Sequence, residues 1–326
     1  MKVICHSFTR PSFNLAVEEY LLKQTEDDCF MLWRNERSII VGRNQNTHAE
    51  VNSDFVRENS LPVIRRLTGG GAVFHDLGNL NYTFITRSAG ENFNNYAVFA
   101  APVIAALKKL GCNAELSGRN DMLVDGRKFS GNAQCMHRGA VMHHGTLMFD
   151  ADVSSMSEAL NVNPLKIRSK GIKSVRSRVT NLAEYLPPGM TVEALAKAIA
   201  DEVRAAFPFA EDYDLTEADV AAIKKLEEEK YATWEWNYGF RREFTHRDEK
   251  YFPFGLVEAQ LTVEDDIIRS VRFFGDYFGR RDVSELEKSL TGIRYRPEDV
   301  LCALREIQLC EYFTSAEPED ILSVMM

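Results

Sequence analysis

The stretch from Arg65 to Asp76 reads Arg-Arg-Leu-Thr-Gly-Gly-Gly-Ala-Val-Phe-His-Asp and joins two arginines to three consecutive glycines. Three adjacent glycines lose much conformational entropy on folding, so they need a physical reason. Without Cβ atoms, the backbone N–H groups of Gly69 to Ala72 can turn towards one ligand and hold an anion. The arginines add forked, permanently charged donors for a carboxylate or a phosphate. A plain turn with solvent-facing arginines is the alternative, and the stretch matches neither the Walker nor the G-x-G-x-x-G pattern.

Lys128 is the second candidate for chemistry, because it follows the dipeptide Asp125-Gly126. Asp-Gly is favoured in two-residue hairpin turns, so the pattern predicts two paired strands with Lys128 opposite Leu123 or its neighbours. Small residues after the lysine leave room for a ligand. The alternative interpretation is an ordinary surface lysine on a hairpin.

Three further features have both a chemical and a structural interpretation. Asp121 either holds Mg²⁺ beside a triphosphate or pairs with a neighbouring arginine, and the sequence leaves both open. His143 and His144 are adjacent, so on a strand they point to opposite faces, which disfavours a shared metal. Cys135 is either a nucleophile that carries an acyl group or an inert buried thiol.

Length and composition favour a globular protein of two domains. The chain has 326 residues, is 45% hydrophobic and 27% charged, and carries a net charge of −9, which argues against a general nucleic-acid binder. It shows no apolar run of membrane-spanning length and no signal-peptide pattern at its start. The six cysteines have no metal-type spacing and are expected to be reduced thiols in the cytoplasm.

Periodicity predicts alternating strands and helices. We expect a helix capped by Ser12 and, further on, helices at 95–110, 192–207 with Thr191 as cap, and 217–231 with Thr216 as cap. Strands are expected at 30–33, 39–42, 62–67 and 79–86. The pattern restarts after Arg242 with strands at 255–263 and 267–274 and helices near 283–290, 297–309 and 318–325. We therefore expect domains at 1–245 and 246–326.

Residues 165–179 contain six cations, and no carboxylate lies between Glu158 and Glu184. In an acidic protein this composition predicts a loop that stays mobile until an anion orders it.

Five motifs in order resemble the lipoate-protein ligase A family. They are the Arg65–Asp76 stretch, Gly118-Arg119-Asn120-Asp121, Arg127-Lys128-x-Ser-Gly-x-Ala133, His143-His144-Gly145-Thr146, and the stretch from Lys170 to Asn181. The segment Phe274-Gly275-Asp276-Tyr277-Phe278 and the helices after it are similar to the accessory domain of ligases that perform both half-reactions. The resemblance implies an α+β catalytic domain with mixed, mostly antiparallel sheets, a fold shared with biotin-protein ligases, followed by a small α+β C-terminal domain.

The same resemblance implies the reaction and its residues. Lipoate and ATP give lipoyl-AMP and pyrophosphate, and a lysine of an acceptor domain then takes the lipoyl group. Lys128 is the implied catalytic residue, touching the acyl carbonyl and the α-phosphate. If Asp121 holds Mg²⁺, as one of its two interpretations has it, the ion would lie beside the ATP phosphates. The implied ligand-binding residues are Arg65, Arg66, Gly70, Gly71, Ala72, Val73, Phe74, Asn79, Ala133, Lys173 and Arg176. An aliphatic tail requires an apolar slot, for which Leu15, Trp33, Leu67, Tyr82 and Phe84 are candidate linings.

The implied partners are the lipoyl domains of E2 subunits of 2-oxoacid dehydrogenases and the glycine cleavage H protein, with no nucleic acid and no membrane, and the chain is expected to be a monomer. Two other functions compete with the ligase. One is an acyl-carrier-dependent lipoyl or octanoyl transferase that uses Cys135, and the other is a non-catalytic nucleotide-binding module. Lipoate-dependent ATP–pyrophosphate exchange separates all three, since only a ligase shows it.

Overall fold

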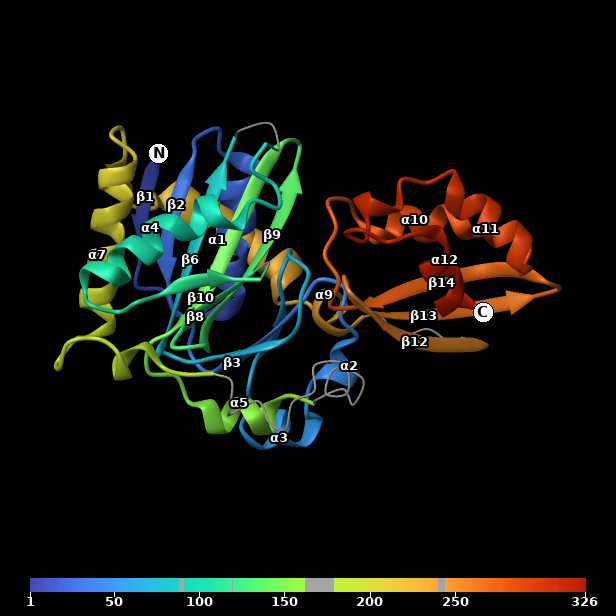
Figure 1. Ribbon diagram of the computed structural model, residues 1–326, viewed down its shortest axis with the longest axis horizontal. Helices are drawn as coiled ribbons and strands as arrows, with labels where there is room; N and C mark the ends of the chain where they lie inside the picture. Colours follow the sequence, from blue (N-terminus) through green and yellow to red (C-terminus); the bar gives the residue numbers. More distant parts are fainter. Residues whose placement is uncertain (88–90, 119, 162–178, 240–243) are drawn as a thin grey trace.

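A computed structural model describes residues 1–87, 91–118, 120–161, 179–239 and 244–326. The chain forms a larger N-terminal part and a smaller C-terminal part, which lie side by side in Figure 1. Within the described residues, no helix is both long and apolar enough to cross a membrane.

A mixed sheet of eight strands forms the centre of the N-terminal part. Its strand order is β11-β1-β2-β6-β10-β9-β8-β7, with β1 parallel to β2 and β11 and the other neighbours antiparallel. The expected mixed, mostly antiparallel α+β fold is therefore confirmed. The strands are β1 (Lys2–Cys5), β2 (Cys29–Trp33), β6 (Asn79–Thr86), β7 (Glu115–Ser117), β8 (Asp121–Val124), β9 (Arg127–His137), β10 (Ala140–Met148) and β11 (Glu211–Asp212).

Helices cover both faces of this sheet. On one face, α4 (Tyr96–Lys109) and α7 (Val192–Ala206) pack against Leu80, Tyr82 and Phe84 of β6 in one apolar core. On the other face, α1 (Pro11–Gln24) and α8 (Glu217–Leu226) enclose a second core. Because side chains alternate along a strand, Asn79, Asn81 and Thr83 of β6 point towards this second face.

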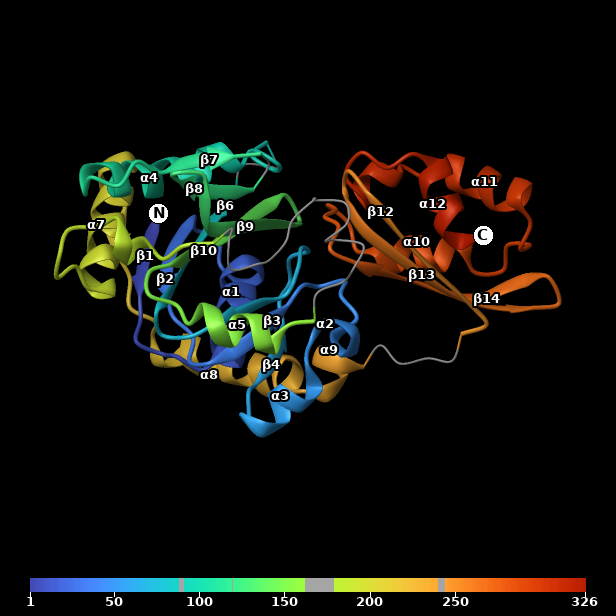
Figure 2. The ribbon, with the colours of Figure 1, turned by 60° about the horizontal axis from the view of Figure 1, so that its bottom comes forward.

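A small sheet lies over part of the second face. It consists of β3 (Ser38–Val41) between β4 (Val63–Arg65), which is parallel to it, and β5 (Val73–His75), which is antiparallel. Short helices surround it, as Figure 2 shows. They are α2 (Thr47–Glu50), α3 (Ser53–Glu58), α5 (Val153–Ala159) and α9 (Trp234–Tyr238). Two further turns belong to the cores of the large sheet: the 3-10 turn Leu182–Glu184 to the first core and the π-helical turn Glu227–Tyr231 to the second.

The C-terminal part has a core of its own. Three antiparallel strands, β12 (His246–Phe252), β13 (Gly255–Glu264) and β14 (Ile267–Gly275), are covered by helices. These are α10 (Val283–Leu290), α11 (Pro297–Arg305), the 3-10 turn Leu309–Glu311 and α12 (Pro318–Met325). It meets the N-terminal part through an ion pair of Arg43 with Asp282 and a hydrogen bond of 2.9 Å from Gly275 N to Asn44 O.

Most expected elements are present, with three differences. Ser12 is not a cap, because α1 begins at Pro11 and the Ser12 hydroxyl donates to Glu227 instead. The helix expected at 217–231 changes to π-helical geometry at Glu227, which leaves Glu227 and Tyr231 both buried. Strand β12 escaped prediction because its run His-Arg-Asp-Glu-Lys is charged, as suits an edge strand.

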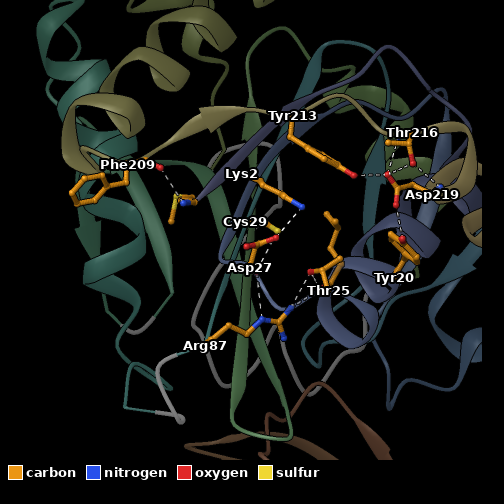
Figure 3. A network of polar contacts seen from close by, with 12 residues as sticks. Lys2, Tyr20, Thr25, Asp27, Cys29, Arg87, Phe209, Tyr213, Thr216 and Asp219 are labelled. Atoms are coloured by element: carbon orange, nitrogen blue, oxygen red, sulfur yellow. Dashed lines mark hydrogen bonds and ion pairs between the residues drawn. The ribbon is translucent and has the colours of Figure 1, made fainter.

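Polar contacts connect β1 to the loop before β2, and α8 to α1 (Figure 3). Lys2 pairs with Asp27 at 2.8 Å, and the hydroxyls of Tyr20 and Tyr213 donate to Asp219 at 2.5 and 2.6 Å. Burial alone would raise the pKa of Asp219, but these hydrogen bonds and those of the capping box lower it to about 2. The carboxylate therefore stays charged and joins α8 to α1.

Three largely buried histidines make the fold sensitive to acid. Burial lowers the pKa of His6 to about 4 and of His75 to about 3, and it lowers that of His143 well below its ordinary value. Below about pH 6.5 the unfolded chain therefore binds protons that the folded chain does not.

We expect the unfolding free energy to fall between about pH 6.5 and about pH 4, by about 1.4 kcal/mol per pH unit for each of these histidines. Urea unfolding at several pH values measures this slope. His6→Phe removes one titrating group and should make the slope shallower by about one proton, whereas His246→Phe on the exposed end of β12 is the matched control. An unchanged slope in His6→Phe would contradict the expectation.

Candidate active site

A cavity of about 1270 Å³ lies between the second face of the large sheet, the small sheet and the glycine loop. Most of the predicted ligand-binding residues line it: Arg66, Gly70, Gly71, Ala72, Val73, Phe74, Asn79, Ala133, Asp121 and Lys128. The structure thus gathers residues that are up to 67 positions apart in the sequence, from Arg66 to Ala133, around one space.

Arg65 does not line this cavity. It is fully buried, and its guanidinium donates to the carbonyl oxygens of Gly42, Arg43, Gln45 and Trp236 at 2.7–2.9 Å and to the Thr47 hydroxyl at 2.6 Å. Burial lowers its pKa to about 9. The prediction that Arg65 contacts a ligand is therefore corrected: its donors hold the framework together.

Arg66 points the other way, as adjacent strand residues do. Its guanidinium donates to the carbonyl oxygens of Gly69 and Gly71 at 2.7 and 2.8 Å and therefore shapes the glycine loop from inside. Its Nε donates to the Thr68 hydroxyl at 3.0 Å. This buried cation lies at the cavity wall.

A relay of hydrogen bonds continues from Thr68. A carboxylate only accepts, so His144 Nδ1 carries a proton and donates it to Glu18 at 2.9 Å. In the neutral ring Nε2 is then the acceptor, and the Thr68 hydroxyl, 2.7 Å away, donates to it. Sequence reasoning missed Glu18 and Thr68 because their spacing signals nothing, although Thr68 sits inside the arginine–glycine motif.

Each of the three consecutive glycines is explained by a different physical constraint. A Cβ on Gly69 would lie 2.4 Å from the Tyr277 oxygen, so this glycine allows close approach of the C-terminal part. Gly70 has a φ of +89° and lies against the ring of Phe278. A Cβ on Gly71 would meet nothing within 4 Å, so Gly71 faces the open cavity.

Lys128 stands as the hairpin pattern predicts. It is paired with Leu123 across β8 and β9, and the turn residues Asp125 and Gly126 both have positive φ, 49° and 74°. Its Nζ lies 2.7 Å from an Asp121 oxygen, with both side chains somewhat over one-third exposed. Because solvent screens this ion pair, the attraction between the two charges is weak. Lys128 therefore remains an accessible cation at the cavity wall.

The apolar slot differs from the prediction. Leu15 and Trp33 line the cavity, as expected, together with Ile40 and Val73. Tyr82 and Phe84 do not, because they lie on the other face of β6 under α4 and α7, and Leu67 is absent from the lining as well. Three polar residues lie among the apolar ones instead: His75, Asn81 and His144.

The C-terminal part also contributes to the wall, which sequence reasoning missed. Its lining residues are Tyr251, Pro253, Phe254, Gly255, Asp276 and Phe278. Nothing in the sequence connects these residues with a loop about 200 positions earlier.

The remaining candidate residues lie either away from the cavity or outside the described residues. Cys135 is not in the cavity lining, and burial raises the pKa of its thiol to about 12, which suits an inert thiol. His143 lies under α4, stacked on Phe99 at 4.8 Å, on the face opposite His144, so the two share no metal. Lys173, Arg176 and the rest of the basic segment up to 178 lie outside the described residues.

Removing the Thr68 hydroxyl should break the relay. Thr68→Val keeps the shape but leaves a buried Arg66 donor and a His144 acceptor unpaired, so we expect a loss of about 2–3 kcal/mol in unfolding free energy. Thr68→Ser keeps the hydroxyl and is the matched control, with a loss below about 1 kcal/mol. Chemical denaturation measures both. Equal losses in the two variants would contradict a specific role for the hydroxyl.

Comparison with known proteins agrees with this geometry. The family "Lipoyl protein ligase A/B catalytic domain" matches residues 10–204, and "Bacterial lipoate protein ligase C-terminus" matches residues 241–325. The chain is 44% identical to the lipoate-protein ligase LplJ of Bacillus subtilis, over 97% of this chain and 96% of that protein. It is 42% identical to lipoate–protein ligase 1 of Staphylococcus aureus over the full length of both.

A solved structure agrees as well. The lipoate complex of P. falciparum LipL1 superposes with a TM-score of 0.83 at 26% identity, covering 99% of this chain and 98% of that one. The chain therefore belongs to the lipoate-protein ligase family, and it is a lipoate ligase rather than an acyl-carrier-dependent transferase.

Proposed function

We propose that the cavity binds lipoate and ATP together, with the lipoate carboxylate and the α-phosphate meeting at Lys128. The observation that carries this proposal is the placement of Lys128: a cation on a rigid hairpin, at the wall of a cavity that continues into an apolar slot. One solved relative supports it, since P. falciparum LipL1 was determined in complex with lipoate. A structural analysis of an archaeal bi-partite lipoate protein ligase, 26% identical to this chain, and its E2 lipoyl domain supports a lipoyl domain as the acceptor.

The first half-reaction needs a cation because two anions must meet. A lipoate carboxylate oxygen attacks the α-phosphorus, the bond to the bridging oxygen breaks, and pyrophosphate leaves. The Lys128 ammonium offsets the repulsion before the step and stabilises the negative charge that grows during it. In the second half-reaction an acceptor lysine amine attacks the acyl carbon, and AMP leaves.

We assign the remaining roles by their position in the wall. Arg66 and the backbone of Gly70 to Phe74 are proposed to hold the acyl head and the nucleotide, Asn79 to lie near the adenine, and Ala133 to leave room beside Lys128. Asp121 offers one carboxylate for Mg²⁺, which commonly takes one or two carboxylates besides phosphate oxygens and water.

We further propose that residues 1–245 and 246–326 act as a catalytic and an accessory domain, since the second has its own core from Phe254 to Met325. Lipoyl domains of E2 subunits and of the glycine cleavage H protein are the proposed acceptors. The proposed setting is a cytoplasmic monomer.

Lys128→Ala should remove most adenylation while the fold stays intact. Loss of one preorganised charge typically costs about 3–4 kcal/mol in the barrier, or several-hundredfold in rate. Lipoate-dependent ATP–pyrophosphate exchange and melting temperature are measured together, with Lys225→Ala on the exposed face of α8 as the control. Near-normal exchange would remove Lys128 from the mechanism, and absence of exchange in the unaltered protein would favour a binding module.

Cys135→Ser should keep ligation, because an adenylate mechanism forms no thioester. Lipoylation of an acceptor domain is followed by mass spectrometry. An acyl group trapped on Cys135 of the unaltered enzyme would contradict the proposal.

A further inference from the structure

Strand β9 contains one additional residue next to Lys128. Met122 of β8 pairs with Ser130 of β9. Leu123, the next residue of β8, pairs with Lys128, so Phe129 is an additional residue between the two pairs. This is a β-bulge, in which two residues of one strand oppose one residue of its neighbour.

The bulge determines the face of the sheet on which Lys128 lies. In a regular strand, residues three apart point to opposite faces, so Lys128 and Gly131 would be separated by the sheet. Across the hairpin, however, Gly131 is the partner of Asp121. Lys128 is the partner of Leu123, and Leu123 lines the cavity, as Asp121 does. Because partners across two strands share a face, Lys128 and Gly131 both lie on the cavity face, while Phe129 is buried in the core under α4 and α7.

The missing side chain of Gly131 leaves space that the end of the Lys128 side chain occupies. A Cβ on Gly131 would lie 3.2 Å from Lys128 Nζ and 3.4 Å from Lys128 Cε. Non-bonded carbon atoms pack best at about 3.5–4.0 Å, so a methyl group here would push the ammonium away. The ammonium therefore lies against the backbone of a glycine three residues further along its own strand.

The other contacts of Lys128 hold its backbone more firmly than its ammonium. On the side away from β8, the Thr180 N–H donates to the Lys128 carbonyl oxygen at 2.9 Å, and Lys128 forms a parallel bridge with Val179. The ammonium pairs with Asp121 at 2.7 Å, but solvent screens this pair and weakens it. The surface at Gly131 thus limits how far the ammonium stands from the strand.

We propose that Gly131 is a positioning residue for Lys128: its missing Cβ lets the ammonium lie close to the strand, so that two anionic groups fit in front of it. The inference rests on the proposed function and adds to it the residue that sets the place of the cation. A charge stabilises a transition state best when its position is fixed beforehand, and a misplacement of about 1 Å can cost about a hundredfold in rate.

The first experiment adds one methyl group in front of the strand with Gly131→Ala. The displaced group is the far end of a flexible side chain, so the melting temperature should match that of Ser270→Thr, which adds one methyl group to β14 outside the cavity lining. ATP–pyrophosphate exchange gives kcat and KM, with kcat referred to the folded fraction. We expect kcat to fall about tenfold in Gly131→Ala, and KM for lipoate and for ATP to change less than about twofold.

The second experiment introduces Gly131→Ala into the Lys128→Ala variant. A methyl group that acts through the lysine should change neither the residual exchange nor the equilibrium binding of lipoate and ATP there by more than about twofold. A methyl group that stands in the path of a ligand would weaken binding with or without the lysine. That result, or an unchanged kcat in Gly131→Ala alone, would overturn the inference. Absence of lipoate-dependent exchange in the unaltered enzyme would instead overturn the proposed function.

Discussion

The site depends on the burial of the Arg65 guanidinium in a ring of backbone carbonyl oxygens. This one side chain connects β4 to the Gly42–Gln45 turn and to α9, which is the last helix of the N-terminal part in the sequence. Because neighbouring strand residues face opposite ways, fixing Arg65 in the framework aims Arg66 into the cavity. In the sequence Arg65 and Arg66 look like two equivalent ligand-binding residues. In the structure Arg65 supports the framework and Arg66 lines the cavity. The cost of removing the first charge from water is offset by several charge-assisted hydrogen bonds.

The sequence correctly predicted those features that depend on only a few adjacent residues. The Asp125-Gly126 turn, the pairing of Lys128 with Leu123 and the capping box of Thr216 and Asp219 all follow from a few adjacent residues. The sequence did not show which face of β6 lines the cavity. Alternation separates Tyr82 and Phe84 from Asn79 and Asn81, but it does not say which set meets the ligand. Aromatic residues suggested a lining for an aliphatic tail, yet α4 and α7 bury them, and the asparagines line the cavity.

The glycine loop shows the other limit of sequence reasoning. Its composition suggested either a cradle for an anion or a plain turn, but Gly69 and Gly70 lie against Tyr277 and Phe278 of the C-terminal part. Contacts between residues about 200 positions apart leave no trace in local periodicity. The loop therefore serves two surfaces, since Gly71 still faces the cavity. The same segment thus contacts the C-terminal part of the chain and lines the cavity.

The charges of the cavity differ from one end to the other. Near Lys128 the wall holds a cation in solvent-screened contact with Asp121, which suits anionic groups that exchange during a reaction. Around Trp33 the wall holds the Asn81 amide and the ring of His75, whose pKa burial lowers to about 3 and which is therefore neutral. A ligand with a charged head and a neutral tail gains at both ends in only one orientation. Reversal would place a carboxylate among neutral groups in a buried slot, at a high desolvation cost, and would leave the lysine facing a ring. The distribution of charge along the cavity therefore favours one orientation of a ligand of this kind.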